Sequence, residues 1–334
     1  MDLFVQKNGS KIYREKEYFV VERKEEGKEY FSYNLIDNII IQEGNQLTSD
    51  FLLEIIEKDI PLYLGDKYGN IRGKFTPITY NTNSNIRERQ YQLWIREYGK
   101  ELGKSWIMEK IENQKKHIKK IYSRRGVLDK FLEIERKFDE NITKIKNITW
   151  NDKDFENRVM GYEGRSSILY YEEIKKFLPE NWSFTKRETQ GAKEPYNIVL
   201  NYAFGILYFK LERYLTLAGL DIQLGIIHSN NNKSNSLIFD FIEPFRILAW
   251  ECAFSLFSKK ELNKNYFNLN EGKIELEGKR VIAKDLYNRL KNIVEYNGKK
   301  MSYEEKIEKR AKELVKELMK NEIYSKLWYF SWKN

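Results

Sequence analysis

Three short segments of the sequence carry side chains suited to holding a divalent metal. His228 ends an apolar stretch and precedes an asparagine-rich loop at residues 230–235. Asp240 and Glu243 lie in an otherwise apolar run, and a helix would place them on one face, about 5 to 6 Å apart between Cβ atoms. Glu163 lies between two nearby glycines, just ahead of a predicted helix. One imidazole with two or three carboxylates is a mixed nitrogen and oxygen set that suits Mn²⁺ or Mg²⁺.

Each segment also has a purely structural interpretation. Asp240 and Glu243 could form a capping box at the start of a helix, with Arg246 neutralising Glu243 one turn later. A histidine at the end of an apolar segment is more often structural, and an acid at a loop–helix junction such as Glu163 is more often solvated. Because helix N-termini commonly display ligands, the capping interpretation leaves a metal site open.

A metal held by these residues would suit phosphodiester chemistry, because it can neutralise a scissile phosphate, activate a hydroxyl and hold the leaving oxygen. The only other histidine, His117, lies among lysines that would repel a metal, so we expect it to be solvated or to face a phosphate. The single cysteine, Cys252, lies in an apolar stretch and is expected to be buried. One cysteine excludes an intrachain disulfide and a cysteine-rich zinc site.

The sequence also offers cations for a polyanionic partner. Lys and Arg number 59 against 50 Asp and Glu, a formal net charge of +9, which alone does not separate nucleic acid from an anionic membrane. The 23 Tyr, 19 Phe and 7 Trp favour nucleic acid, since rings that are not in the core can stack on bases. Two basic clusters are predicted to bind DNA, with a solvated face as the alternative. They are Lys115, Lys116, Lys119, Lys120, Arg124 and Arg125, which would form a ridge on one helix, and Lys186 with Arg187.

The elements that must position these residues form two predicted domains, in an α+β fold. Short runs of β-branched and aromatic residues at 3–5, 18–21, 30–31, 39–41 and 62–64 predict strands, with one helix starting near Thr48. The polar residues 81–85 predict a linker, so we place a β-rich domain at 1–84 and a larger all-α domain at 85–334. Residues 303–324 predict an amphipathic helix with one apolar stripe, laid on the body of the protein or on a partner.

The predicted compartment is the cytoplasm. The most apolar segment, residues 198–220, is interrupted by Lys210, Glu212 and Arg213, so it predicts a buried helix and not a membrane span. The N-terminus has an early acid and no long apolar run, which does not fit a secretory signal.

Taken in order, the three segments resemble the Cas-one integrases, which insert new spacers into CRISPR arrays, and the resemblance extends over most of the chain. It rests on an acid before a glycine, a histidine after a Gly-Leu-Asp…Leu-Gly segment, and a paired acid followed by arginine. Here these are Glu163 with Gly164, His228 after residues 219–225, and Asp240 with Glu243 and Arg246. The resemblance implies that Glu163, His228, Asp240 and Glu243 are catalytic and that Glu163, His228 and Glu243 bind Mn²⁺ or Mg²⁺. It implies a supporting role for Arg246, and it leaves open whether Asp240 or Glu243 contacts the metal.

The resemblance also implies a substrate and partners. The protein would be a homodimer joined through its strand domains, working with the small Cas-two protein. It would join short double-stranded DNA with 3′-hydroxyl ends into a CRISPR repeat by transesterification, and could also hydrolyse DNA. Two other functions fit the residues alone: a basic nucleic-acid scaffold without catalysis, and a metal-dependent nuclease without an integration role.

Overall fold

The computed structural model describes residues 2–5, 8–36, 38–66, 71–75, 84–228 and 235–320. The chain divides into two compact units, Met1–Thr82 and Asn83–Asn334. This division lies two residues from the one predicted after residue 84. Of the predicted linker, residues 81–83 lie outside the described ranges, as do residues 230–234 of the asparagine-rich loop. Among the described helices, none is long and apolar enough to cross a membrane.

The described part of the N-terminal unit holds two four-stranded sheets and the helix α1 (Ser49–Glu57). The first sheet has the strand order β1-β5-β7-β8, in which the first three strands are parallel and the edge strand β8 is antiparallel. The second has the order β4-β3-β2-β6. The strands are β1 (Asp2–Val5), β2 (Lys11–Glu15), β3 (Tyr18–Arg23), β4 (Gly27–Ser32), β5 (Asn38–Gln42), β6 (Gln46–Leu47), β7 (Leu62–Gly65) and β8 (Ile71–Phe75).

Each strand predicted from the sequence is present in this unit, and so is the helix. Thr48 is the N-cap of α1, and its Oγ1 accepts a hydrogen bond from the backbone N–H of Phe51. Phe51 and Ile55 lie one turn apart and are fully buried, with the Phe51 ring 5.4 Å from that of Phe19 on β3. The apolar residues of the strands and of α1 therefore form one core.

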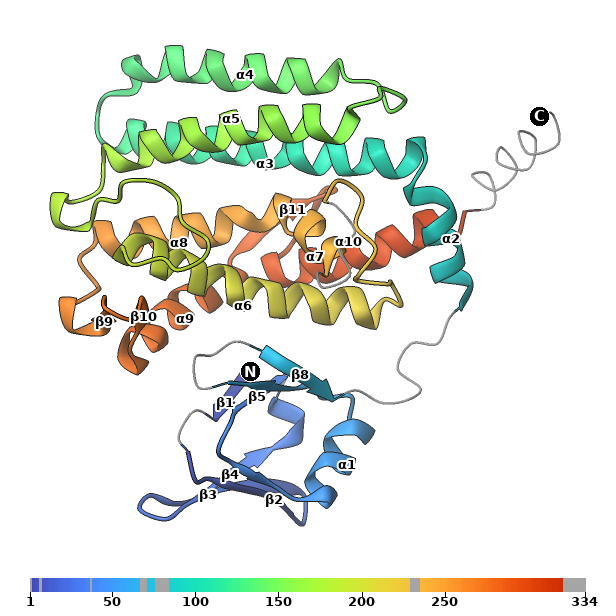
Figure 1. Cartoon of the computed structure of the whole chain (residues 1–334), viewed down its shortest axis with the longest axis vertical. Coiled ribbons are helices and arrows are strands. Elements are labelled where there is room, and N and C mark those ends of the chain that lie inside the picture. Colours follow the sequence, from blue (N-terminus) through green and yellow to red (C-terminus); the bar gives the residue numbers. More distant parts are fainter. Residues whose placement is uncertain are drawn as a thin grey trace. The chain divides into compact units, whose positions relative to one another are not determined.

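The second unit is predominantly helical, which confirms the α+β fold class (Figure 1). Its helices are α2 (Ser84–Trp94), α3 (Glu97–Arg124), α4 (Leu132–Lys146), α5 (Phe155–Lys175), α6 (Pro195–Leu217), α7 (Ser236–Phe241), α8 (Arg246–Ser258), α9 (Leu276–Lys291) and α10 (Tyr303–Leu318). Helices α3, α4 and α5 pack side by side, and α6 packs against α8 and α9 (Figure 1). The long helix α3 also contacts α8, so it joins the two groups.

Two predictions about this unit hold in detail. Helix α6 is buried as expected, and its Lys210 is accommodated because its Nζ donates to Glu304 Oε1 over 3.0 Å. Helix α10 packs on α2, α6 and α9 through the apolar stripe that includes Ile307, Ala311 and Leu314. It therefore lies on the body of the unit; residues 321–324 of the predicted helix lie outside the described ranges.

The prediction of an all-α second domain was wrong in one respect, because the unit also contains two short hairpins. They are formed by β9 (Phe267–Asn268) with β10 (Lys273–Ile274), and by β11 (Ile293–Tyr296) with β12 (Lys299–Ser302). Between β11 and β12, Asn297 and Gly298 have φ angles of 50° and 71°. Asn-Gly at such a position is a strong signal for a two-residue hairpin turn.

Candidate active site

Glu163 lies in the middle of helix α5, which corrects the prediction that it sits at a loop–helix junction. The glycines beside it do not form a turn, because α5 is continuous through both. Neither is needed for close packing, since a Cβ atom at Gly161 or Gly164 would meet no other atom within 4 Å. The helix continues through both because α5 buries Phe155, Val159 and other residues against α3 and α4. Tertiary packing here outweighs the low helix propensity of glycine.

The carboxylate of Glu163 is bound on two sides. Ser167, one turn later on α5, donates its hydroxyl to Glu163 Oε1 over 2.8 Å. The ammonium of Lys110 on α3 forms an ion pair with the same oxygen. The Glu163 side chain is 12% exposed, so it is mostly buried but not sealed from solvent.

Glu243 lies at the start of the 3₁₀ turn Glu243–Phe245 that leads into α8, and only 2% of its side chain is exposed. Arg246 donates two hydrogen bonds to it, over 2.9 and 3.0 Å, and Lys110 Nζ lies 2.7 Å from its Oε2. Burial alone would raise the pKa of Glu243, but the charges of Arg246 and Lys110 lower it to about 2. Glu243 is therefore an ionised carboxylate at neutral pH.

Asp240 is buried, and its carboxylate organises the segment that carries His228. The backbone N–H groups of Ile226, Ile227 and His228 donate to it over 2.5, 3.2 and 3.1 Å. Its Oδ1 also lies 2.6 Å from His228 Nδ1. The capping box that was the alternative interpretation is therefore not formed: Asp240 lies within α7 and binds the preceding segment, not the amides of its own helix.

This arrangement fixes the orientation of the His228 imidazole. With Nδ1 bound to Asp240, the opposite nitrogen, Nε2, is directed away from that carboxylate. Burial disfavours the charged imidazolium, but the hydrogen bond and charge of Asp240, with the charge of Glu243, raise the pKa of His228 overall. The close approach of residues 226–228 to Asp240 also requires a glycine at position 225. A Cβ atom on Gly225 would lie 2.5 Å from Ser236 Cβ and 3.1 Å from Asp240 Oδ2.

Lys110 is the site residue that the sequence analysis missed. Its side chain is only 7% exposed, and its ammonium bridges Glu163 and Glu243. Burial disfavours a charged lysine, yet the charges of Glu163 and Glu243 raise the pKa of Lys110 above its usual value. A signal was available, because Lys110 shares the buried face of α3 with Trp106, Ile107 and other apolar residues, and an unpaired lysine is costly there.

The structure thus brings the predicted residues together in two pairs. Glu163 and Glu243 meet around the Lys110 ammonium, and His228 is paired with Asp240. In the part of the chain that the structure describes, no three His, Cys, Asp or Glu side chains converge closely enough to hold a metal as they stand. The donor types nevertheless fit Mn²⁺ or Mg²⁺, and a cation, the Lys110 ammonium, already lies between the two carboxylates.

The other histidine, His117, corrects a second prediction. It is buried between α3, α5 and α8, where its Nδ1 lies 2.8 Å from the Tyr170 hydroxyl and its ring packs edge-on against Phe254. Burial lowers the pKa of His117 to about 4. It is not solvated, because only 4% of its surface is exposed and its ring packs between Tyr170 and Phe254.

The cations of the first predicted DNA-binding cluster lie on different sides of α3. Lys115 pairs with Asp139 over 2.6 Å and Lys119 with Glu135 over 2.9 Å, both acids being on α4. Lys120 instead pairs with Glu251 of α8 over 2.9 Å. The six cations therefore do not form a single ridge. Three of them are exposed and have no ion pair within the described ranges: Lys116, Arg124 and Arg125.

In the second cluster, Arg187 binds side chains of helix α6. Its guanidinium donates to Asn197 Oδ1 over 3.2 Å and to Asn201 Oδ1 over 2.5 Å, and it lies over the Phe204 ring. Lys186 is exposed. The predicted contacts of both clusters with DNA stay predictions.

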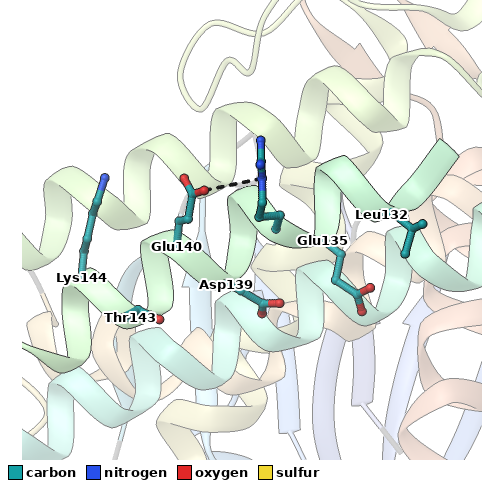
Figure 2. Close-up of a pocket in the computed structure, with 7 residues that line it drawn as sticks. Leu132, Glu135, Asp139, Glu140, Thr143 and Lys144 are labelled. Carbon is teal, nitrogen blue, oxygen red and sulfur yellow. Dashed lines mark ion pairs between the residues drawn. The ribbon is translucent and has the colours of Figure 1, made fainter.

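A hollow of about 610 Å³ on α4 lies away from these acids, because none of the predicted catalytic residues lines it. Figure 2 shows Glu135 and Asp139 on one side of α4 and Glu140 on another. Glu135 and Asp139 are the acids that pair with α3. The hollow is therefore a charged helix surface, separate from the acids that surround Lys110.

Comparison with known proteins identifies the family of this chain. Residues 3–288 match the family model described as "CRISPR associated protein Cas1". The chain is 28% identical to a CRISPR-associated protein Cas1 of Methanobrevibacter ruminantium, over 84% of this chain and 85% of that protein. It is 25% identical to a CRISPR-associated endonuclease Cas1 of Francisella tularensis subsp. novicida, over 94% of each.

Two solved structures share the fold. A casposase bound to integration product has a TM-score of 0.82 at 23% identity, over 95% of this chain and 90% of that one. A CAS1 protein from Thermotoga maritima has a TM-score of 0.79 at 19% identity, over 96% of this chain and 97% of that one. The family match covers most of the sequence, and the chain belongs to the Cas1 family of CRISPR-associated proteins.

Proposed function

We propose that this chain is a metal-dependent DNA integrase and endonuclease of CRISPR adaptation. It would join short duplex DNA with 3′-hydroxyl ends into a CRISPR repeat. Its membership of the Cas1 family and its similarity to relatives described as endonucleases support this function. The observation that carries the proposal is the convergence of two carboxylates, from α5 and from the 3₁₀ turn before α8, on one buried cation.

In this proposal Glu163, Glu243 and Nε2 of His228 bind Mn²⁺ or Mg²⁺. The metal would neutralise charge on the scissile phosphate and favour the deprotonated form of the attacking hydroxyl. Asp240 is a positioning residue, because its carboxylate is already committed to His228 and to three backbone N–H groups. Glu243 is the better candidate for direct contact, since Arg246 holds it ionised in a fixed orientation.

Joining by transesterification needs no external energy source. The oxygen of the incoming 3′-hydroxyl forms a bond to phosphorus as its proton is lost, and the bond from phosphorus to the leaving 3′-oxygen breaks. The leaving oxygen then takes up a proton, so one phosphodiester replaces another. The chain must therefore supply placement and charge stabilisation, which are the roles that a fixed set of acids, cations and an oriented imidazole can fill.

We further propose that the chain acts as a homodimer with the small Cas2 protein. A solved structure described as a Cas6-RT-Cas1–Cas2 complex shares the fold, with a TM-score of 0.78 over 95% of this chain and 35% of that one, at 19% identity. Another, a Cas1 from a structure described as a TtCas1–DNA complex, has a TM-score of 0.59 at 14% identity over 96% of this chain. The cytoplasmic location stays a prediction.

A strand-transfer assay in Mn²⁺ tests this function. Wild-type protein should join DNA that ends in a 3′-hydroxyl but not DNA that ends in a 3′-hydrogen. Hydrolysis, in which water is the nucleophile, should not depend on a 3′-hydroxyl. Glu163→Gln, Glu243→Gln and His228→Ala should each lose the joined product while retaining DNA binding. Unchanged joining in all three variants would favour a non-catalytic scaffold, and cleavage without any joining would favour a nuclease with no integration role.

A further inference from the structure

Polar side chains join α3 to α5 in a regular series of pairs, and the two helices lie side by side (Figure 1). Each pair joins a residue of α3 to the residue 53 positions later on α5. The pairs are Lys110 with Glu163, Gln114 with Ser167, and His117 with Tyr170. The spacing of four and then three residues places all of them on one face of each helix. The middle pair therefore lies one helical turn beyond Glu163.

The middle pair is connected to Glu163 by hydrogen bonds that have a fixed direction. The Ser167 hydroxyl donates to Glu163 Oε1 over 2.8 Å, and Gln114 Nε2 donates to Ser167 Oγ over 3.2 Å. A hydroxyl has one hydrogen, and a carboxylate that is paired with an ammonium accepts and does not donate. With its hydrogen directed at Glu163, Ser167 can only accept from Gln114. The amide nitrogen of Gln114 is therefore the atom that must face Ser167.

This orientation of Gln114 leaves its own oxygen without a partner. Gln114 is fully buried, and its Oε1 accepts no hydrogen bond from any residue that the structure describes. A buried acceptor without a partner is unfavourable and uncommon. In the opposite orientation, Oε1 would accept the Ser167 hydrogen, and Glu163 would lose its bond from that hydroxyl. The amide is thus oriented by the donor that it supplies to Ser167.

The two oxygens of Glu163 differ in their surroundings. Lys110 and Ser167 both bind Oε1. Oε2 accepts no hydrogen bond within the described ranges. If a divalent cation displaces Lys110, as the proposed function requires, Ser167 is the partner that Glu163 keeps. Its hydroxyl would then hold one oxygen of the carboxylate while the other is available to the cation.

We propose that Ser167 and Gln114 are positioning residues for Glu163 as a metal ligand. Ser167 keeps Oε1 in place, and Gln114 fixes the direction of the Ser167 hydroxyl. Neither residue contacts the metal. This inference rests on the proposed function, because it concerns the same metal. Partners that orient a metal ligand typically contribute 10- to 100-fold to metal affinity, and one neutral hydroxyl is expected to lie near the lower end.

The first experiment compares two neighbouring serines by calorimetric titration with Mn²⁺ alone. Ser166 is the matched control, because it is buried but its Oγ donates to the Tyr162 carbonyl and accepts from Asn141 Nδ2, over 3.0 and 3.1 Å. Ser167→Ala should lower the Mn²⁺ affinity about tenfold, whereas Ser166→Ala should match wild type. Ser167→Thr keeps a hydroxyl and should restore the wild-type affinity.

The second experiment separates positioning from stability at Gln114. Methionine has a similar volume, and Gln114→Met removes both the donor to Ser167 and the unpaired oxygen. The urea midpoint in EDTA should therefore stay close to that of wild type, while the Mn²⁺ affinity falls by up to about tenfold. A purely structural role would give the opposite result, a lower urea midpoint with unchanged Mn²⁺ affinity, and would overturn the assignment of Gln114.

A double variant tests whether Gln114 acts through Ser167. Gln114→Met combined with Ser167→Ala should bind Mn²⁺ no more weakly than Ser167→Ala alone, because the hydroxyl that Gln114 orients is already absent. Losses that add would show that Gln114 acts by another route. The inference is also overturned if Ser167→Ala binds Mn²⁺ as wild type does, or if Ser166→Ala loses as much affinity as Ser167→Ala.

Glu163→Gln distinguishes a failure of this inference from a failure of the proposed function. If Glu163→Gln weakens Mn²⁺ binding but Ser167→Ala behaves like its control, only the positioning roles are wrong. If Glu163→Gln binds Mn²⁺ as tightly as wild type, Glu163 is not a ligand, and the proposed metal site fails together with this inference.

Discussion

Replacing Lys110 by methionine removes the cation that holds the two acids together while keeping a side chain of similar length. In the metal-free protein, Glu163 would retain only the Ser167 hydroxyl, while Glu243 would retain its two bonds to Arg246. Removing one partner of a buried ion pair costs about 3 to 5 kcal/mol. Because Arg246 still neutralises Glu243, we expect the lower end, a loss of about 3 kcal/mol in the free energy of unfolding.

The same substitution should favour the metal. At the proposed metal site of the wild type, Mn²⁺ would have to displace the Lys110 ammonium from the carboxylates, whereas in Lys110→Met no cation would oppose it. If the whole 3 kcal/mol is recovered on binding, Mn²⁺ affinity rises about 100-fold. Urea denaturation in EDTA gives the first quantity, and calorimetric titration with Mn²⁺ gives the second.

Lys104 provides the matched control for this experiment. It is a second buried lysine on α3, whose ammonium pairs with Glu101 over 2.7 Å and donates to the Ile148 carbonyl over 2.9 Å. Lys104→Met should also destabilise the protein, but it should leave the Mn²⁺ affinity unchanged. A Lys110→Met protein that binds Mn²⁺ no more tightly than wild type would refute the reasoning.

Three further predictions follow from the site and its surroundings. Asp240→Asn should weaken Mn²⁺ binding by about 10- to 100-fold in calorimetry, because His228 loses the carboxylate that orients it; unchanged affinity would contradict this role. Gly225→Ala should destabilise the protein by about 1 to 3 kcal/mol because its Cβ meets atoms at 2.5 to 3.1 Å, whereas Gly161→Ala, in open space on α5, should stabilise it by about 0.5 to 1 kcal/mol, both measured by urea denaturation. Burial lowers the pKa of His117 in the folded protein to about 4, below the usual histidine pKa of 6.5, so the unfolded chain binds the extra proton and up to about 3 kcal/mol of stability is lost as pH falls from 6.5 to 4. His117→Gln should flatten that loss, and an equally steep dependence in the variant would assign it to other groups.

The strands could be predicted from the sequence where apolar residues cluster, as in β3 and β5. Strand β2 (Lys11–Glu15) was missed because only Ile12 among its residues is fully apolar and buried, and charged residues occupy both ends. Its place in the sheet is set by pairing with β3 and β6, which no local pattern encodes. The hairpin at Asn297 and Gly298 was not predicted, although its Asn-Gly pair is a local signal for a tight turn.

The site could be predicted only in part, for a related reason. The acids and His228 were recognisable by type and spacing, and the pairing of Arg246 with Glu243 was anticipated from their i,i+3 spacing. The partners of Asp240 could not be anticipated, because its three backbone donors belong to a segment that returns to it through tertiary contacts. The helical position of Glu163 was obscured by its glycines, whose open surroundings become visible only in the packed structure.

The central claim is that Glu163, Glu243 and His228 share one divalent cation, with Lys110 holding the carboxylates in its absence. A crystal structure of the protein with Mn²⁺, located by its anomalous scattering, tests this most directly. The account predicts one Mn²⁺ bound by both glutamates and by Nε2 of His228, with the Lys110 ammonium displaced and Asp240 still on Nδ1. Mn²⁺ bound elsewhere, or held by Asp240 with Lys110 still bridging the two glutamates, would contradict it.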